Sequence, residues 1–322
     1  MTELLAYFEQ ELPKINGFLD EETDKLEGLV KGVAKHVLLA PGKRIRPILT
    51  ILSARALGYS KEDIYPLASS LELLHAATLL HDDILDDADL RRGVTASHLV
   101  FGITETVLAG DVLLALANLI GADYGKSRIS SILASAIMST AEGEIREIAH
   151  ISEPKVDRDI YMDIIIGKTA RLLEASCRIG AAVACDDTEL EDALGDFGLN
   201  MGIAFQLVDD ALDYESPVGD TGKPEGGDLK EGKVTLPLIL YLEMLEDKEA
   251  ESLLAEIKNR TLSDARRDEV LESIRAHGLG TKTRQSAAEY IEKAKACLTP
   301  LSDSVESRVL KLSADFVLTR RK

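Results

Sequence analysis

Apolar residues recur at steps of three and four between Leu67 and Asp87, in a stretch that contains neither glycine nor proline. This is the period of an α-helix, whereas a half-buried strand would alternate with a period of two. The same period predicts helices over residues 104–120, 130–150, 157–184, 188–214, 234–246, 248–258, 265–276, 281–298 and 303–319. Segments 67–87 and 188–214 are apolar on most faces, which is typical of helices at the centre of a bundle.

The composition also favours an all-α fold. Aromatic residues make up 4% of the chain and tryptophan is absent, whereas strands are enriched in aromatic and β-branched residues. Neither internal repeats nor an interdomain linker is evident, so we predict a single all-α domain over residues 1–322, a bundle of about ten or more helices. The longest polar interruption, residues 215–233, is predicted to be a loop, and loops of this length are usually functional or disordered.

The charge balance excludes one large class of partners. The chain carries 56 acidic residues against 37 lysines and arginines, which gives a formal net charge of -19. Non-specific nucleic-acid binding needs a basic surface, so we expect no nucleic-acid partner. An anionic membrane surface is disfavoured for the same reason.

The number and spacing of the cysteines, together with the N-terminal sequence, predict the cellular compartment of the protein. Cys177, Cys185 and Cys297 are an odd number without a CxxC pair, as expected for reduced thiols in a cytosolic protein. The first residues lack the basic-then-apolar pattern of a signal peptide, and we expect no apolar run of the ~20 residues needed to span a bilayer. We therefore expect a cytoplasmic protein without stable membrane insertion.

Two aspartate triads share the spacing i, i+1, i+4. They are Asp82, Asp83 and Asp86, and Asp209, Asp210 and Asp213. On a helix the first and last members of such a triad point within ~40° of each other, so their oxygens can converge. Like charges this close repel one another, and acids near a helix C-terminus also oppose the macrodipole, which suggests a bound cation such as Mg²⁺.

Two alternatives compete with a magnesium site. A single triad in so acidic a chain is more often a solvated helix face, but two copies with equal spacing, each after an apolar run, disfavour that interpretation. A Ca²⁺ cage made by protein ligands is also conceivable, although neither triad has the loop pattern of an EF-hand.

Basic residues lie near both triads. They are Lys43, Arg44 and Arg46 in GKRIRP, Arg91 and Arg92 after the first triad, Lys168 in IIIGKTARL, and Lys223, Lys230 and Lys233 after the second triad. Arginine suits bidentate phosphate contacts and lysine suits point-charge contacts. Aspartate triads together with separate clusters of lysine and arginine therefore indicate a diphosphate ligand that is bound partly through metal and partly directly. A P-loop nucleotide site is unsupported because GxxxxGK[ST] is absent. Each basic cluster taken singly could instead be a surface ion pair or a snorkelling side chain.

These motifs resemble those of the trans-isoprenyl diphosphate synthase (polyprenyl synthetase) family. The matching segments are GKRIRP (42–47), ELLHAATLLHDDILDDADLRRG (72–93), LAGDVLL (108–114), EGE (142–144), KTARL (168–172), AFQLVDDALDY (204–214) and GKPEGGDLKEGKVTLPL (222–238). They are similar to the long-chain branch, to which octaprenyl-forming enzymes belong. The resemblance implies an isoprenoid-synthase-type helical bundle around a central active-site cavity.

The resemblance also implies the reaction. An allylic diphosphate such as farnesyl diphosphate ionises with the help of about two or three Mg²⁺ per active site, held by the six aspartates. Isopentenyl diphosphate then attacks the allylic cation head-to-tail, and an all-trans polyprenyl diphosphate results after proton loss. Its octaprenyl-length product would serve quinone side chains.

Site residues follow by resemblance, position by position. Isopentenyl diphosphate is assigned to Lys43, Arg46, His75 and Arg92. The allylic diphosphate is assigned to Arg91, Lys168, Lys223 and Lys233. Thr169 and Gln206 are expected beside the reacting carbons, where their dipoles can stabilise a cation, and His81 is expected to be structural.

The chain departs from the family pattern at two places. Ala40 and Pro41 replace glycines before Gly42. Glu147 stands where the family usually carries glutamine, so the role of that position is open.

Chain length should depend on residues that precede Asp82 by one and two helical turns. Leu74, Ala77 and Thr78 are expected to line an apolar tunnel, and the family's farnesyl-forming members place an aromatic residue at the position of Ala77 or Thr78. Both are small here, so a product longer than geranylgeranyl is expected. The tunnel floor is expected from Ile137, Met138 or segment 104–120.

Three alternative functions remain open at this point. The first is a short-chain farnesyl or geranylgeranyl diphosphate synthase, and the second is a terpene cyclase, although cyclases generally lack the second triad. The third is a non-catalytic subunit of a heteromeric synthase, although such subunits lose site residues that this chain retains. The resemblance further implies a homodimer, with segment 104–120 as an interface element.

Overall fold

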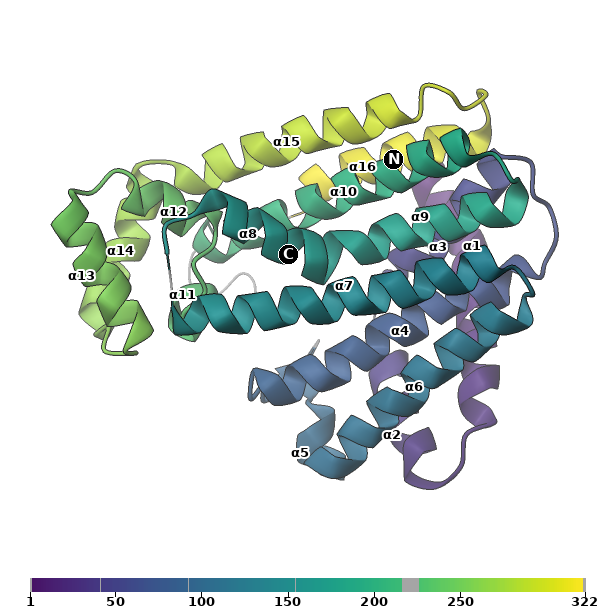
Figure 1. Ribbon diagram of the computed structural model, residues 1–322, viewed down its shortest axis with the longest axis horizontal. Coiled ribbons are helices and arrows are strands. Elements are labelled where there is room, and N and C mark those ends of the chain that lie inside the picture. The colour runs from purple at the N-terminus through teal and green to yellow at the C-terminus, as the bar shows by residue number, and fades with distance from the viewer. Residues whose placement is uncertain (1, 41, 92, 154, 216–225, 321–322) are drawn as a thin grey trace. The chain divides into compact units, whose positions relative to one another are not determined.

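The computed structural model describes residues 2–40, 42–91, 93–153, 155–215 and 226–320 (Figure 1). The prediction of an all-α fold is confirmed. The strands within these ranges form one antiparallel hairpin, in which β1 (Leu90–Arg91) pairs with β2 (Val94–Thr95).

Helices account for the rest of the regular structure. Those in the first half are α1 (Thr2–Asp24), α2 (Gly28–Leu39), α3 (Ile45–Ala56), α4 (Ile64–Leu85), α5 (Ser97–Phe101), α6 (Ile103–Asp123) and α7 (Ser127–Ser152). Those that follow are α8 (Arg158–Ile165), η1 (Ile166–Ala170), α9 (Arg171–Ala184), α10 (Thr188–Glu215), α11 (Gly227–Glu231), α12 (Leu236–Leu242), α13 (Asp247–Lys258), α14 (Asp264–Ala276), α15 (Leu279–Cys297) and α16 (Val305–Leu318).

The predicted helices agree with observed ones within a few residues, with two differences, whereas α1, α2 and α5 have no predicted counterpart. The helix predicted over 157–184 is interrupted by the π-helical turn η1, which holds the KTA sequence. Part of the loop predicted over 215–233 is helical, because α11 lies within it. Its residues 216–225 lie outside the described ranges.

The chain divides into two compact units. Unit 1 comprises residues 1–137, 175–195 and 300–312, and unit 2 comprises residues 138–174, 196–299 and 313–322. Four helices, α7, α9, α10 and α16, contribute residues to both. A single domain over the whole chain stays a prediction.

In unit 1, α4 forms the centre of the core. It packs most extensively against α6 and also against α3. Its apolar side chains are fully buried on several faces, as at Leu67, Leu71 and Leu73. Burial of each such side chain stabilises the fold by roughly 1.5–3 kcal/mol, so the apolar segment predicted to be central has that role.

His81 shows how closely α4 and α6 approach. Its ring Nε2 lies 3.1 Å from the backbone oxygen of Val107, and a Cβ atom placed on Gly110 would lie 2.3 Å from the same nitrogen. Gly110 is therefore required by the packing of His81 on α6. This contact agrees with the structural role expected for His81.

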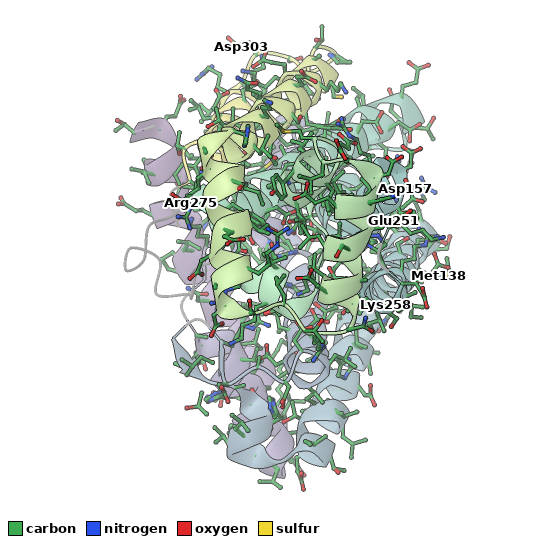
Figure 2. The ribbon with its side chains drawn as sticks, turned by 90° about the vertical axis from the view of Figure 1, so that its left-hand side faces the viewer. Met138, Asp157, Glu251, Lys258, Arg275 and Asp303 are labelled. Carbon is green, nitrogen blue, oxygen red and sulfur yellow. The ribbon has the colours of Figure 1, made fainter. Side chains whose placement is uncertain are left out.

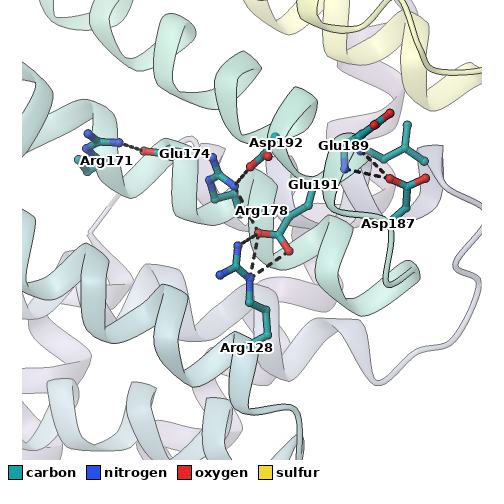
Figure 3. A network of polar contacts seen from close by, with 9 residues as sticks. Arg128, Arg171, Glu174, Arg178, Asp187, Glu189, Glu191 and Asp192 are labelled. Carbon is teal, nitrogen blue, oxygen red and sulfur yellow. Dashed lines mark hydrogen bonds and ion pairs between the residues drawn. The ribbon is translucent and has the colours of Figure 1, made fainter.

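A network of ion pairs joins the start of α10 to α7 and α9 within unit 1 (Figure 3). The Glu191 carboxylate, which is 6% exposed, accepts hydrogen bonds from Arg128 and Arg178. Arg178 also pairs with Asp192 at 2.6 Å. Burial of a carboxylate is costly unless it is paired, so the two arginines explain how Glu191 is tolerated there.

Unit 2 contains the α13–α14 pair that faces the viewer in Figure 2, with Glu251 and Lys258 on α13 and Arg275 near the end of α14. Elsewhere in this unit, helices touch through small residues. A Cβ atom on Gly143 of α7 would lie 2.4 Å from the backbone nitrogen of Lys168, and one on Gly202 of α10 would lie 2.6 Å from the Cα atom of Ala170. Both contacts fix the backbone of η1.

Helix α6 differs from the other core helices because it is apolar but poorly covered. It is the one helix among the described residues that is long and apolar enough to cross a membrane, with a window of mean hydropathy 1.6 that is 28% buried. The sequence-based expectation that no apolar run reaches ~20 residues is therefore wrong for α6. Large apolar side chains on α6 face solvent, among them Ile103, Leu108 and Leu119.

Candidate active site

The first aspartate triad lies at the C-terminal end of α4 in unit 1. Asp82 and Asp83 belong to the last turn of the helix, and Asp86 follows as its C-cap. Asp83 is 1% exposed, whereas Asp82 is half-buried and Asp86 is exposed. The three carboxylates therefore have different environments despite their compact spacing.

Arg91 compensates the buried member of this triad. Its Nε donates to Asp83 Oδ1 at 2.5 Å, and a second guanidinium nitrogen contacts the same oxygen. A charge-assisted pair of this kind offsets the desolvation of Asp83 and the repulsion from its acidic neighbours. A small cavity beside the pair is lined by both residues and by His36, Leu79 and Thr95.

The residues expected to bind isopentenyl diphosphate also fall in unit 1. Lys43 is exposed just before α3, Arg46 lies in the first turn of α3, and His75 lies on α4 two turns before Asp82. Arg92, the fourth residue of this set, lies outside the described residues.

Arg44 is a residue of this segment that sequence reasoning left without a role. Its side chain is buried and donates hydrogen bonds to Glu72 Oε1 (2.7 Å), Asn16 Oδ1 (3.2 Å) and the backbone oxygen of Leu38. Its φ of +48° is uncommon for a residue other than glycine. These hydrogen bonds link the N-terminal end of α3 to three other segments of unit 1.

The second triad lies near the C-terminal end of α10 in unit 2. Asp210 is 3% exposed and is held by neutral donors, because Tyr161 Oη donates to Oδ2 at 2.5 Å and Gln206 Nε2 donates to Oδ1 at 2.8 Å. Burial raises the pKa of Asp210 to about 7, although the two hydrogen bonds act in the opposite direction. The sequence did not predict Tyr161 as a site residue, because it lies 49 residues before Asp210 in the chain.

The other two aspartates of this triad have separate partners. The carboxylate of Asp213 accepts hydrogen bonds from the backbone N–H groups of Gly227 (3.2 Å) and Asp228 (3.0 Å) and so binds the start of α11. Asp209 Oδ1 accepts a hydrogen bond from Arg320 Nη2 at 3.0 Å. The Arg320 guanidinium also lies over the ring of Phe205, 4.0 Å from its centroid.

The KTA sequence forms η1 and brings three predicted residues together. Thr169 Oγ1 donates to Gln206 Oε1 at 2.9 Å, and the Gln206 amide in turn donates to Asp210, so the orientation of the amide is fixed at both ends. Lys168 is 22% exposed at its side chain and pairs with Glu144 at 2.7 Å and Glu147 at 2.5 Å. Burial lowers the pKa of Lys168, but the two carboxylates outweigh it and the net shift is upward. π-Helical turns are frequent at functional sites.

Two further basic residues were expected in this region. Lys233 follows α11 and is half-buried, with Glu231 as one partner at 2.7 Å. Lys223 lies outside the described residues.

The residues expected to line the prenyl tunnel lie on α4 in unit 1. Leu74 and Ala77 are fully buried and Thr78 is half-buried. Of the proposed floor residues, Ile137 is half-buried, whereas Met138 is 58% exposed and its position is labelled in Figure 2. Met138 therefore does not suit a buried tunnel floor within this chain.

The donor set fits a metal that binds together with substrate. Among the described residues, no group of three or more histidine, cysteine or acidic side chains forms a preassembled metal cage. Mg²⁺ usually takes one or two carboxylates and completes its shell with water and substrate phosphate, so the half-buried or exposed oxygens of Asp82, Asp86 and Asp209 suit it.

Comparisons with known proteins assign the family. The Polyprenyl synthetase family model matches residues 27–274. Octaprenyl diphosphate synthase of Escherichia coli (strain K12) is 35% identical over 298 residues, which cover 92% of this chain and 91% of that protein. A short chain isoprenyl diphosphate synthase of Methanothermobacter thermautotrophicus is 33% identical over 291 residues, 89% of each protein.

A solved structure agrees in fold over the whole chain. The polyprenyl synthase from Caulobacter crescentus CB15, complexed with calcium and isoprenyl diphosphate, has a TM-score of 0.92 at 36% identity and covers 100% of this chain and 98% of its own. The two sequence relatives differ in the product length that their names give. This chain belongs to the polyprenyl synthetase family of prenyltransferases.

Proposed function

We propose that this protein is an all-trans polyprenyl diphosphate synthase that condenses isopentenyl diphosphate head-to-tail with an allylic diphosphate such as farnesyl diphosphate. The observation that carries the proposal is the hydrogen-bonded chain from Thr169 through Gln206 to Asp210, beside Lys168 and Asp209. It combines a fixed dipole, a cation and metal-binding carboxylates, which are the groups needed to ionise an allylic diphosphate.

The leaving diphosphate is the group that gains negative charge in this reaction. Lys168 and Lys233 in unit 2 are cations suited to bind it, and preorganised charges of this kind stabilise a transition state strongly. The family motif assigns Arg91 to the same diphosphate. Mg²⁺ held by the aspartates of the two triads would supply further charge neutralisation on the phosphate oxygens. Lys43, Arg46 and His75 would bind the diphosphate of the second substrate, as their place in the family motif implies.

The allylic carbon gains positive charge at the same time. The Gln206 amide oxygen accepts from Thr169, and its NH₂ group donates to Asp210, so the amide cannot rotate to present its positive end. Its oxygen and that of the Thr169 hydroxyl are negative dipole ends that can stabilise the cation without reacting with it. The proton lost after condensation would pass to the released diphosphate.

We propose a long-chain product of octaprenyl length, used for quinone side chains. Ala77 is fully buried and Thr78 half-buried on the helix that carries the first triad, and neither is large enough to close a tunnel. A short-chain product is the alternative, since relatives of comparable identity include a short-chain synthase.

We also propose a cytoplasmic homodimer without stable membrane insertion. Ile103, Val107, Leu108 and Leu119 of α6 are 37–59% exposed, so a second copy could bury them. Asp111, with a side chain that is 60% exposed, lies on the same helix, and a bilayer would disfavour such a charge. Sedimentation equilibrium should give twice the 35.0 kDa chain mass, and Leu108→Glu should shift it toward the monomer.

The reaction is tested by incubating the purified protein with Mg²⁺, farnesyl diphosphate and labelled isopentenyl diphosphate. We expect label in an apolar diphosphate and release of inorganic diphosphate, both abolished by a chelator. Absence of incorporation by the homodimer would favour a non-catalytic subunit, and release of a cyclic hydrocarbon would favour a cyclase.

A further inference from the structure

Lys168 is bound by more negative charge than it can neutralise. Its ammonium contacts Glu144 at 2.7 Å and Glu147 at 2.5 Å, and the side chains of the two glutamates are 12% and 17% exposed. The spacing of three residues places both carboxylates on the same side of α7. Because the cluster is largely buried, salt screens it only weakly.

The backbone keeps these carboxylates close to Lys168. Gly143 of α7 and Gly167 of η1 touch directly, since a Cβ atom on Gly167 would lie 2.9 Å from the Gly143 Cα atom. Glu144 follows one of these glycines and Lys168 follows the other. The contact between the two glycines therefore fixes the separation of the two backbones on which the charged groups stand.

The second triad is linked to this cluster by hydrogen bonds. Thr169, the residue after Lys168, donates to Gln206, which in turn donates to Asp210. One lysine thus faces two glutamates, whereas the nearby Asp209 is already paired with Arg320. A diphosphate that approaches Lys168 in the absence of other cations meets a net negative environment.

One carboxylate is sufficient to orient an ammonium group, so the second requires another explanation. We propose that Glu147 is a specificity-determining residue that suppresses diphosphate binding to Lys168 until divalent cations are bound. The inference rests on the proposed function, in which Lys168 binds the allylic diphosphate. Glu147 would thereby favour the metal-bound form of the substrate over the free anion.

The test is calorimetric titration of inorganic diphosphate into the full-length protein, once with a chelator and once with saturating Mg²⁺. In the chelator, Glu147→Gln should bind diphosphate about tenfold more tightly than the wild type, equivalent to ~1.4 kcal/mol. With Mg²⁺ the difference should fall below about threefold, because bound cations already neutralise the cluster. Glu142→Gln is the matched control, since Glu142 is exposed on another side of α7, and it should behave as wild type.

Two more variants separate the possible failures. Lys168→Met should weaken diphosphate binding in Mg²⁺; if it does not, the proposed function of Lys168 is wrong. If Lys168→Met weakens binding but Glu147→Gln leaves the metal-free affinity unchanged or lower, the role of Glu147 is overturned. Glu147→Met provides a second neutral side chain should Glu147→Gln fold poorly, and it should show the same tightening.

Discussion

The two aspartate triads have the same spacing and the same place near the C-terminal end of a long helix, but their buried members are stabilised differently. Asp83 in unit 1 is held by the Arg91 guanidinium, whereas Asp210 in unit 2 is held by the neutral donors Tyr161 and Gln206. Burial raises the pKa of Asp210 to about 7, because its two neutral donors offset only part of the desolvation. The sequence motif therefore specifies only the carboxylates. Their partners in the folded chain determine how much of the carboxylate charge is compensated before any metal binds.

The largest effects should come from the first aspartate of each triad. Asp82→Ala and Asp209→Ala should each lower turnover by about 10³–10⁴-fold, because a group that stabilises charge in the transition state is lost. Steady-state kinetics at saturating Mg²⁺, with circular dichroism to confirm the fold, would measure this. Near-wild-type rates in either variant would remove that triad from the metal site.

Removal of the partner of each buried aspartate should lower the free energy of unfolding by different amounts in the two triads. Arg91→Met leaves Asp83 buried and unpaired and should cost about 3–5 kcal/mol in the free energy of unfolding. Tyr161→Phe removes one of two neutral donors to Asp210 and should cost about 1–3 kcal/mol. Urea denaturation of the metal-free proteins gives both values, and equal losses would contradict the difference in charge compensation.

The second triad should also make stability depend on pH. The pKa of Asp210 is raised in the folded state to about 7, above its unfolded value of about 4, so the stability it contributes is fully present below pH ~4 and is lost as pH rises through ~7. We expect a loss on the order of 2–4 kcal/mol in metal-free protein between these limits. Asp210→Asn should flatten that part of the urea-denaturation profile; an unchanged profile would assign the dependence to other groups.

The smallest change in rate should accompany a change in product. Ala77→Tyr places a ring on the helix that carries the first triad, two turns before Asp83, and should shorten the product while turnover falls less than about tenfold. Reversed-phase chromatography of the dephosphorylated products measures the length. Thr78→Ala is the control and should leave the length unchanged; unchanged length in Ala77→Tyr as well would contradict the tunnel assignment.

Local pattern was sufficient to predict most of the fold. The period of apolar residues located α4, α6, α7 and α10 within a few residues. This works because the apolar face of a helix repeats every three or four residues along the sequence. It could not reveal the π-helical turn at residues 166–170, which depends on close contacts with Gly143 and Gly202 from other helices.

The candidate site shows the same limit. The triads and KTA were found from their spacing, but Tyr161, Arg320 and the buried role of Arg44 depend on contacts between segments far apart in the chain. The positive φ of Arg44 has no sequence signal of the kind that a glycine would give. Met138 is expected at the tunnel floor from its place on the predicted 130–150 helix, but the structure leaves it 58% exposed.

The most direct test of the account is the length of the product formed from farnesyl diphosphate, labelled isopentenyl diphosphate and Mg²⁺. We predict an all-trans chain longer than geranylgeranyl, centred on octaprenyl, and its loss in Asp82→Ala and Asp209→Ala. A product that stops at farnesyl or geranylgeranyl would contradict the long-chain assignment. Absence of any elongated diphosphate from a folded, Mg²⁺-saturated homodimer would contradict the proposed catalytic function itself.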